Sequence, residues 1–180
     1  MNVLLLYGTT EGQTKKITQF VADRLVQKGH PVSIANAAEG ELGHDPRGFA
    51  AVLIAASLHA GCYQPAVVRF VRENRTAISA RPNAFLSVSL AAASDDSGDV
   101  TGLKQCVDRF IAETGWTPGC IHHVAGAFRF TAYGFFKRWA MRYIAYRKGT
   151  PTDASRDYEL TDWDDLAGFA DTFAALAVAS

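Results

Sequence analysis

Threonines, a glycine and a glutamine cluster where the first apolar stretch of the chain ends, in a pattern suited to binding an anion. The segment is Gly8-Thr9-Thr10-Glu11-Gly12-Gln13-Thr14. The next residues have helical periodicity, and the start of a helix offers unpaired N–H groups and the positive end of the helix dipole. Gly12 permits close approach of the backbone, and the threonine hydroxyls are further donors. We predict a phosphate monoester site, without lysine or arginine in the loop, formed by Thr9, Thr10, Glu11, Gly12, Gln13 and Thr14.

Other phosphate-binding motifs fit this segment less well. It matches neither G-x-G-x-x-G nor G-x-x-x-x-G-K-S/T, which disfavours dinucleotide-binding and P-loop proteins. A phosphorelay receiver needs acidic residues after its first strand and an aspartate ending its third, where this chain has Gly8-Thr9 and Ala56-Ser57. A threonine-rich turn that only caps a helix stays open as an alternative.

Composition and charge indicate one globular domain, residues 1–180. The chain has 180 residues, of which 48% are apolar, and this argues against disorder. Its 18 Lys and Arg equal its 18 Asp and Glu, so no overall field favours nucleic acid. The cysteines Cys62, Cys106 and Cys120 lack C-x-x-C spacing, which argues against a disulfide framework or a metal site. We expect a cytoplasmic protein, because no secretion signal is visible and no apolar run reaches the roughly eighteen residues of a membrane span.

Short apolar runs alternate with amphipathic stretches, which predicts an α/β fold with a parallel sheet. The expected strands are Val3 to Tyr7, Val32 to Ala35, Ala50 to Ala56, Ala84 to Leu90 and Ile121 to Phe128. The expected helices are Thr14 to Gln27, Ala66 to Ala77, Thr101 to Glu113 and Trp163 to Ala177. Right-handed crossovers place helices on both faces of such a sheet, and ligands bind outside the carboxyl ends of its strands.

The phosphate loop and three later segments resemble a known family. The spacing Thr9-x-x-Gly12-x-Thr14 is similar to the flavodoxin phosphate fingerprint S/T-x-T-G-x-T, with Glu11 in the place of a threonine. Over nearly its full length the chain resembles the flavodoxin-type protoporphyrinogen dehydrogenases, which pass electrons to menaquinone. The segments that carry this resemblance are Glu11 to Thr14, Ala55 to Tyr63, Ala125 to Phe130 and Tyr158 to Trp163.

This resemblance implies a doubly wound, five-stranded parallel sheet of order 2-1-3-4-5, with FMN as the cofactor. It also implies an oxidoreductase of heme biosynthesis that takes electrons from a porphyrinogen-type or other flat hydrophobic donor and passes them to a quinone. Two alternatives stay open. One is an electron-transfer flavodoxin that shuttles electrons between protein partners, and the other is an interaction domain that has lost its cofactor.

Two further loops are expected to hold the isoalloxazine ring of FMN. They follow the third and fourth strands and contribute Ser57, Leu58, His59, Gly61, Tyr63, Ser89, Leu90, Ala91 and Ala92. Leu58, His59 and Tyr63 are possible faces or stacking partners of the ring, and the small residues of the second loop allow backbone contact. His59 is the candidate catalytic residue, because a histidine there could place positive charge near the flavin or shuttle a proton. A surface histidine without a role is the alternative.

A basic and aromatic stretch separates the fifth strand from the last helix, and we predict an elaboration of the domain at residues 129–157. No acidic residue occurs from Thr114 to Thr152. Read as a helix, this stretch has an aromatic face and a basic face. The predicted membrane or substrate surface comprises Arg129, Lys137, Arg138, Trp139 and Arg142. It suits the anionic inner face of the cytoplasmic membrane, or porphyrin propionates. The alternative is an apolar face packed on the sheet and a solvated basic face.

Overall fold

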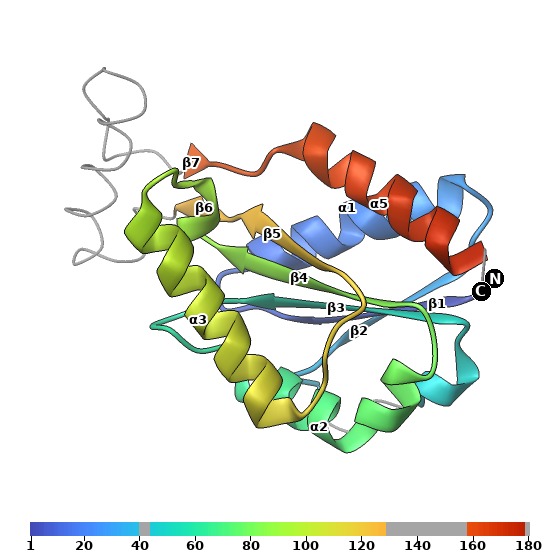
Figure 1. The fold of residues 1–180 in the computed structure, drawn as a ribbon. Coiled ribbons are helices and arrows are strands. Elements are labelled where there is room, and N and C mark those ends of the chain that lie inside the picture. Colours follow the sequence, from blue (N-terminus) through green and yellow to red (C-terminus); the bar gives the residue numbers. More distant parts are fainter. Residues whose placement is uncertain (40–43, 129–157, 179–180) are drawn as a thin grey trace.

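The computed structural model describes residues 1–39, 44–128 and 158–178, and its centre is a five-stranded sheet (Figure 1). The strands pair in the order β2-β1-β3-β4-β5, and every pairing is parallel. This confirms the predicted α/β fold and strand order. The strands are β1 Val3–Gly8, β2 Val32–Asn36, β3 Ala51–Ser57, β4 Asn83–Ser89 and β5 Ile121–Ala125.

Strand β1 shows why the sequence of this sheet is so apolar. All six of its residues are buried. Leu5 lies opposite Ile34 of β2 on one side and Leu53 of β3 on the other. Successive side chains point to opposite faces, so Leu5 belongs to one hydrophobic core and Leu4 to the other. Both faces need apolar residues because helices cover both.

The helices form two layers around the sheet (Figure 1). Helices α1 Gln13–Gln27 and α5 Trp163–Val178 pack on one face, whereas α2 Pro65–Ser79 and α3 Ser97–Thr114 pack on the other. Two short 3-10 helices, η1 Pro46–Gly48 and η2 Ala91–Ala93, lie in the connections. No helix in these described ranges is long and apolar enough to cross a membrane.

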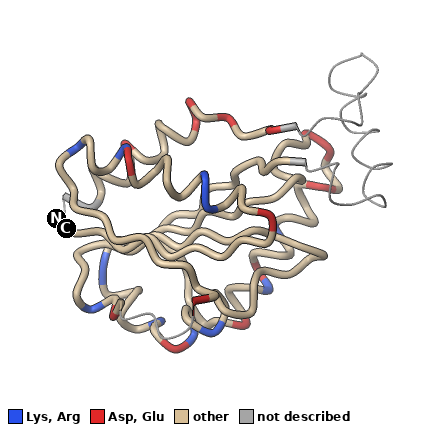
Figure 2. Tube along the Cα trace, turned by 180° about the vertical axis from the view of Figure 1, so that it is seen from behind, with Lys and Arg blue, Asp and Glu red and all other residues tan. Residues whose placement is uncertain are grey.

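Polar contacts between the helices lie on the surface. In Figure 2, which shows the molecule from behind, basic and acidic residues are interspersed over the helices. Arg24 of α1 donates two hydrogen bonds of 2.8 Å to Asp171 of α5, and Lys28 lies 3.2 Å from the same carboxylate. The hydrogen bonds from Arg24 hold the pKa of Asp171 well below its usual range. These contacts connect α1 to α5 above a core that supplies most of the packing.

The predicted strand from Ile121 to Phe128 is wrong in one respect, because the run divides at Gly126. Strand β5 ends at Ala125, and the next residues form β6 Ala127–Phe128, which pairs antiparallel with β7 Tyr158–Glu159. The Gly126 N–H donates to Ser89 O of the main sheet, while Gly126 O accepts from the N–H of Leu160. The backbone therefore changes partner at this glycine. The predicted helix within residues 129–157 lies outside the described residues.

Candidate functional site

A hollow of about 460 Å³, counting its solvent-open mouth, lies at the carboxyl ends of the parallel strands. The loops after β1, β3, β4 and β5 all contribute to it. This is the edge of a doubly wound sheet at which ligands generally bind. The lining residues are Thr9, Thr10, Glu11, Gln13, Thr14, Ser57, Leu58, His59, Val88, Ser89, Leu90, Gly126 and Ala127.

The first turn of α1 has no side-chain cap. Gly12 occupies the N-cap position with a left-handed backbone, φ 90°, which strongly favours glycine. The Thr9 hydroxyl accepts a hydrogen bond of 2.8 Å from the Gly12 N–H instead of capping the helix proper. The alternative of a merely capping threonine turn therefore does not describe this loop. The N–H groups at the start of α1 keep their capacity to bind an anion.

Thr14 is the residue that most directly indicates a ligand. It is the second residue of α1, lines the hollow and is only 1% exposed. Its hydroxyl oxygen is buried and has no hydrogen-bond partner among the residues that the structure describes. Such an unpaired group costs about 1–3 kcal/mol. A phosphate oxygen in the hollow would supply the missing acceptor.

An ion pair lies near the start of α1, outside the lining of the hollow. Lys16, one turn further along α1, places its Nζ 2.6 Å from Oε2 of Glu159 and 5.1 Å from the centre of the Trp163 ring. Burial raises the pKa of Glu159, but hydrogen bonds from Lys16 and Gln13 outweigh it and hold that pKa below its usual value. No lysine or arginine of the described chain lines the hollow itself. An anion there would depend on N–H and hydroxyl donors.

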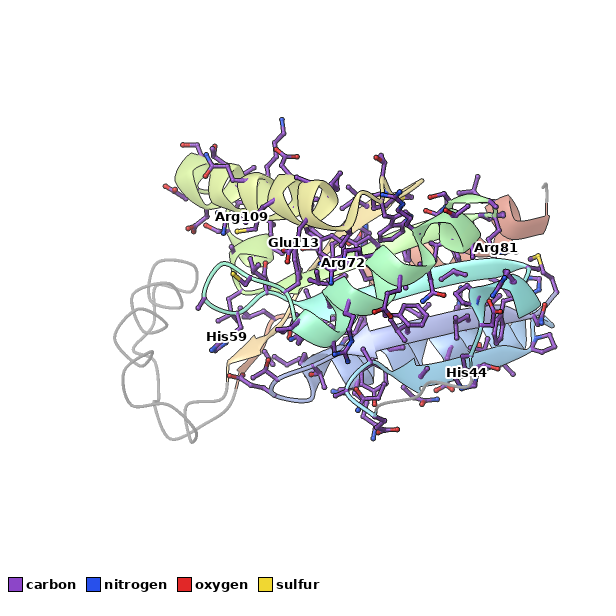
Figure 3. The ribbon with its side chains drawn as sticks, turned by 90° about the horizontal axis from the view of Figure 1, so that it is seen from below. His44, His59, Arg72, Arg81, Arg109 and Glu113 are labelled. Atoms are coloured by element: carbon purple, nitrogen blue, oxygen red, sulfur yellow. The ribbon has the colours of Figure 1, made fainter. Side chains whose placement is uncertain are left out.

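The loop after β3 is a tight backbone hairpin. His59 and Cys62 exchange two backbone hydrogen bonds, of 2.9 and 3.0 Å, across Ala60 and Gly61. Both intervening residues have positive φ, 49° for Ala60 and 80° for Gly61. The left-handed conformation costs an alanine about 1–2 kcal/mol. His59 is exposed on this hairpin, at the opposite end of the molecule from His44 and Arg81 (Figure 3).

Comparison with known families agrees with this geometry. The model of a flavodoxin domain matches residues 4–155. The chain belongs to the flavodoxin domain family. Among solved structures, a flavodoxin from Pseudomonas aeruginosa has a TM-score of 0.60 at 16% identity, covering all of both chains. A short-chain flavodoxin associated with a non-canonical PDU bacterial microcompartment has a TM-score of 0.59 at 12% identity, covering 98% of this chain and 99% of that one. Both likenesses concern the fold.

Two curated relatives are similar over almost the whole chain. A protein of Escherichia coli strain K12 named protoporphyrinogen IX dehydrogenase [quinone] is 30% identical over 178 residues, which cover 98% of this chain and 96% of that protein. A protein of the same name from Leishmania major is 30% identical over 177 residues, covering 98% of this chain and 76% of that protein. These similarities agree with the resemblance described above.

Membership of the flavodoxin family also agrees with FMN as the predicted cofactor, and the residues present fit its phosphate. The unpaired Thr14 hydroxyl and the uncapped start of α1 are the donors that a phosphate monoester needs. The structure brings most of the predicted phosphate and ring residues into one hollow. Those that line it are Thr9, Thr10, Glu11, Gln13, Thr14, Ser57, Leu58, His59, Ser89 and Leu90.

Tyr63 has a core position in place of the predicted one beside the ring. It is 6% exposed, and its hydroxyl lies 2.7 Å from Oγ of Ser87. Its ring meets Phe85 and Phe110 edge to face, each with centroids 5.1 Å apart. Burial raises the pKa of Tyr63 to about 12. This side chain therefore anchors the loop instead of facing the hollow.

Other predicted ring residues also lie away from the hollow. Gly61 and Tyr63 line a second cavity, between the hairpin and α3, to which Arg109 and Glu113 also contribute (Figure 3). Ala91 and Ala92 lie in η2 and are not among the residues that line the hollow. The Ala92 N–H nevertheless donates a hydrogen bond of 3.1 Å to Oγ of Ser89, which does line it. All the predicted membrane or substrate surface residues lie outside the described part of the chain; they are Arg129, Lys137, Arg138, Trp139 and Arg142.

Sequence reasoning missed Gln64, which links two of the loops. The side-chain amide of Gln64 donates to Oγ of Ser57 and, at 3.1 Å, to Oγ1 of Thr10. Gly8 makes room for this arrangement, because a Cβ there would lie 2.5 Å from Cγ2 of Val67 and 3.0 Å from Oε1 of Gln64. The position of Gln64 directly before Pro65, where α2 begins, was the available signal.

Proposed function

We propose that this protein is an FMN-dependent oxidoreductase that passes reducing equivalents from a porphyrinogen-type donor to a quinone. The unpaired Thr14 hydroxyl at the uncapped start of α1 is the observation that carries the cofactor part of this proposal. The names of the two relatives described above support the donor and the acceptor. When bound, FMN supplies the hydride and electron chemistry, while the protein binds and orients it.

The protein residues have two separate tasks in this proposal. At the start of α1, the N–H groups and the hydroxyls of Thr9, Thr10 and Thr14 bind the phosphate. At the other side of the hollow, Leu58 and Leu90 provide apolar surface for the ring, with Ser57 and Ser89 beside them. His59 is exposed at the rim, where it is a candidate for holding or moving a proton.

The described lining residues suit a ring that stays accessible to a flat donor. They include no phenylalanine, tyrosine or tryptophan, because Tyr63 is held in the core. Gly126 and Ala127 leave additional space on the β5 side. A large planar donor can then approach the ring face without displacing an aromatic side chain of these described lining residues.

We also propose that the basic and aromatic stretch within residues 129–157 meets an anionic membrane surface or the donor's propionates on the cytoplasmic side. Strands β6 and β7 flank this stretch, and Phe128 pairs with Tyr158. Ala127 of β6 lines the hollow. The described residues on either side of the stretch, Phe128 and Tyr158, thus belong to the strand pair that borders the proposed ring site, where a quinone acceptor would have to arrive.

Charge reversal tests the role of this stretch. Replacing Lys137, Arg138 and Arg142 by glutamate is expected to lower binding to anionic vesicles by at least tenfold, since each cation contributes roughly 1 kcal/mol near acidic lipid. FMN affinity should not change. Sedimentation with vesicles containing phosphatidylglycerol measures vesicle binding, and flavin fluorescence measures FMN affinity. The matched control reverses the exposed Arg69, Arg72 and Arg75 of α2. Equal vesicle binding by wild type and the first variant would remove the membrane proposal.

Anaerobic turnover tests the proposed reaction. FMN-loaded protein should be bleached by protoporphyrinogen and should regain its oxidised spectrum when a menaquinone analogue is added. Bleaching in one two-electron step supports the dehydrogenase. No bleaching by the porphyrinogen, together with reduction in two separate one-electron steps, would instead indicate an electron carrier between protein partners.

A further inference from the structure

The segment of residues 158–163, here called the return segment, lies against the candidate phosphate site. The Thr161 hydroxyl donates a hydrogen bond of 2.7 Å to the backbone oxygen of Ala125, at the end of β5. The same hydroxyl accepts one of 3.0 Å from Nε2 of Gln13, the first residue of α1. In the residue before Thr161, the N–H of Leu160 donates a hydrogen bond of 3.0 Å to the backbone oxygen of Gly126.

Thr161 therefore joins two walls of the hollow. Gln13 lines the hollow at the start of α1, and Ala125, the other partner of Thr161, directly precedes the lining residue Gly126. Thr161 is 9% exposed, so water competes little for its two hydrogen bonds. The exposed pair of Lys16 and Glu159 attaches the same segment one turn further along α1, but such pairs contribute little on their own.

We propose that Thr161 is a positioning residue for the phosphate cradle and that it makes the site selective for a phosphorylated flavin. The inference rests on the FMN site proposed above. The Gln13 amide also hydrogen-bonds Glu159, but the Glu159 side chain is 34% exposed whereas Thr161 is buried. A glutamine side chain has several rotatable bonds, and without Thr161 it would lose its buried partner at the helix start. By holding the amide of Gln13, Thr161 keeps the first turn of α1 in register with the end of β5. The phosphate then meets donors that are already arranged.

The test compares two flavins that differ only in the phosphate. Thr161→Val keeps the shape of the side chain and removes both hydrogen bonds. We expect FMN affinity to fall about tenfold, as for loss of a partly buried hydrogen bond. Riboflavin affinity should change by less than about twofold, because riboflavin does not reach the cradle's donors. Thr161→Ser, which restores the hydroxyl, should regain most of the FMN affinity. Fluorescence titration of the apoprotein measures the affinity for both flavins.

Thr114 offers a matched control in a distant part of the core. Its buried hydroxyl also donates to a backbone oxygen, Phe110 O at 2.8 Å, and accepts from an N–H, that of Trp116 at 3.3 Å. Thr114→Val should lower stability while leaving the ratio of FMN to riboflavin affinity unchanged. A second variant, Gln13→Met, removes the same contact from the other partner, together with the hydrogen bond of Gln13 to Glu159. Adding Thr161→Val to it should not weaken FMN binding further.

The outcomes separate this inference from the cofactor assignment. If Thr161→Val weakens both flavins equally, or neither, Thr161 is a structural residue and the inference is overturned. Additive effects of Thr161→Val and Gln13→Met would overturn it as well. If the wild-type protein does not distinguish FMN from riboflavin, the phosphate site itself is absent and the proposed function fails first.

Discussion

Replacing Thr14 with valine is expected to weaken FMN binding by about 10- to 100-fold, because a hydrogen bond to a charged group contributes about 1.5–3 kcal/mol. The hydroxyl of Thr14 is buried beside the start of α1 and has no protein partner in the described structure. In the proposed complex it donates to the phosphate. Fluorescence titration of the apoprotein with FMN measures the change, and riboflavin should bind the variant as it binds the wild type.

The stability of the apoprotein provides a second, independent test of the Thr14 prediction. Since the Thr14 hydroxyl is unpaired without a ligand, Thr14→Val should leave the free energy of unfolding of the apoprotein unchanged or raise it. Thr18 is the matched control, because it is fully buried one turn later in α1 and its hydroxyl donates a hydrogen bond of 2.8 Å to the backbone oxygen of Thr14. Thr18→Val should therefore lower stability without lowering FMN affinity. Unchanged FMN affinity in Thr14→Val would contradict the assignment of the phosphate site.

Replacing Phe85 with alanine should lower the free energy of unfolding by about 3–5 kcal/mol, the usual cost of truncating a buried aromatic residue. Phe85 is 0% exposed and stacks on Phe110 with centroids 4.7 Å apart. It also meets the edges of Tyr63 and Trp116. The loss is large compared with the roughly 5–15 kcal/mol by which such domains are stable. Urea unfolding of the apoprotein measures it, because bound flavin would add its own stabilisation.

Phe85→Leu separates the volume of the cavity from the loss of an aromatic ring. Leucine refills much of the space, so this variant should lose clearly less stability than Phe85→Ala. The loop after β3 depends on the same cluster through Tyr63, whose hydroxyl contacts Ser87. A loss under about 1 kcal/mol for Phe85→Ala would show that the cluster is not packed as described.

The fold was largely predictable from the sequence because the sheet is buried on both faces. The apolar runs around Leu5 and Leu53 indicated doubly covered strands, and both residues are fully buried. The division at Gly126 was not predictable in the same way. Its backbone hydrogen bonds go to Ser89 and Leu160, which are distant in the sequence. The hydropathy pattern of a sequence does not indicate where the backbone changes its hydrogen-bonding partner.

The candidate site was predictable where function depends on local chain geometry. Gly12 and Thr14 are neighbours on a helix start, so their spacing alone predicts an anion site. The position of Tyr63 depends on Phe85 and Phe110, which come from other elements. An aromatic residue in a loop fits a flavin or a core equally well until those partners are placed. The link from Thr161 to Gln13 likewise joins residues 148 positions apart.

The central claim is that amides and hydroxyls at the start of α1 hold the phosphate of FMN in a hollow that no lysine or arginine of the described residues lines. Isothermal titration calorimetry of the wild-type apoprotein in buffer free of phosphate and sulfate tests it most directly. FMN should bind with a stoichiometry of one, at least about tenfold more tightly than riboflavin, because only FMN reaches the Thr14 hydroxyl. Equal affinities for the two flavins, or no heat with FMN, would contradict the account.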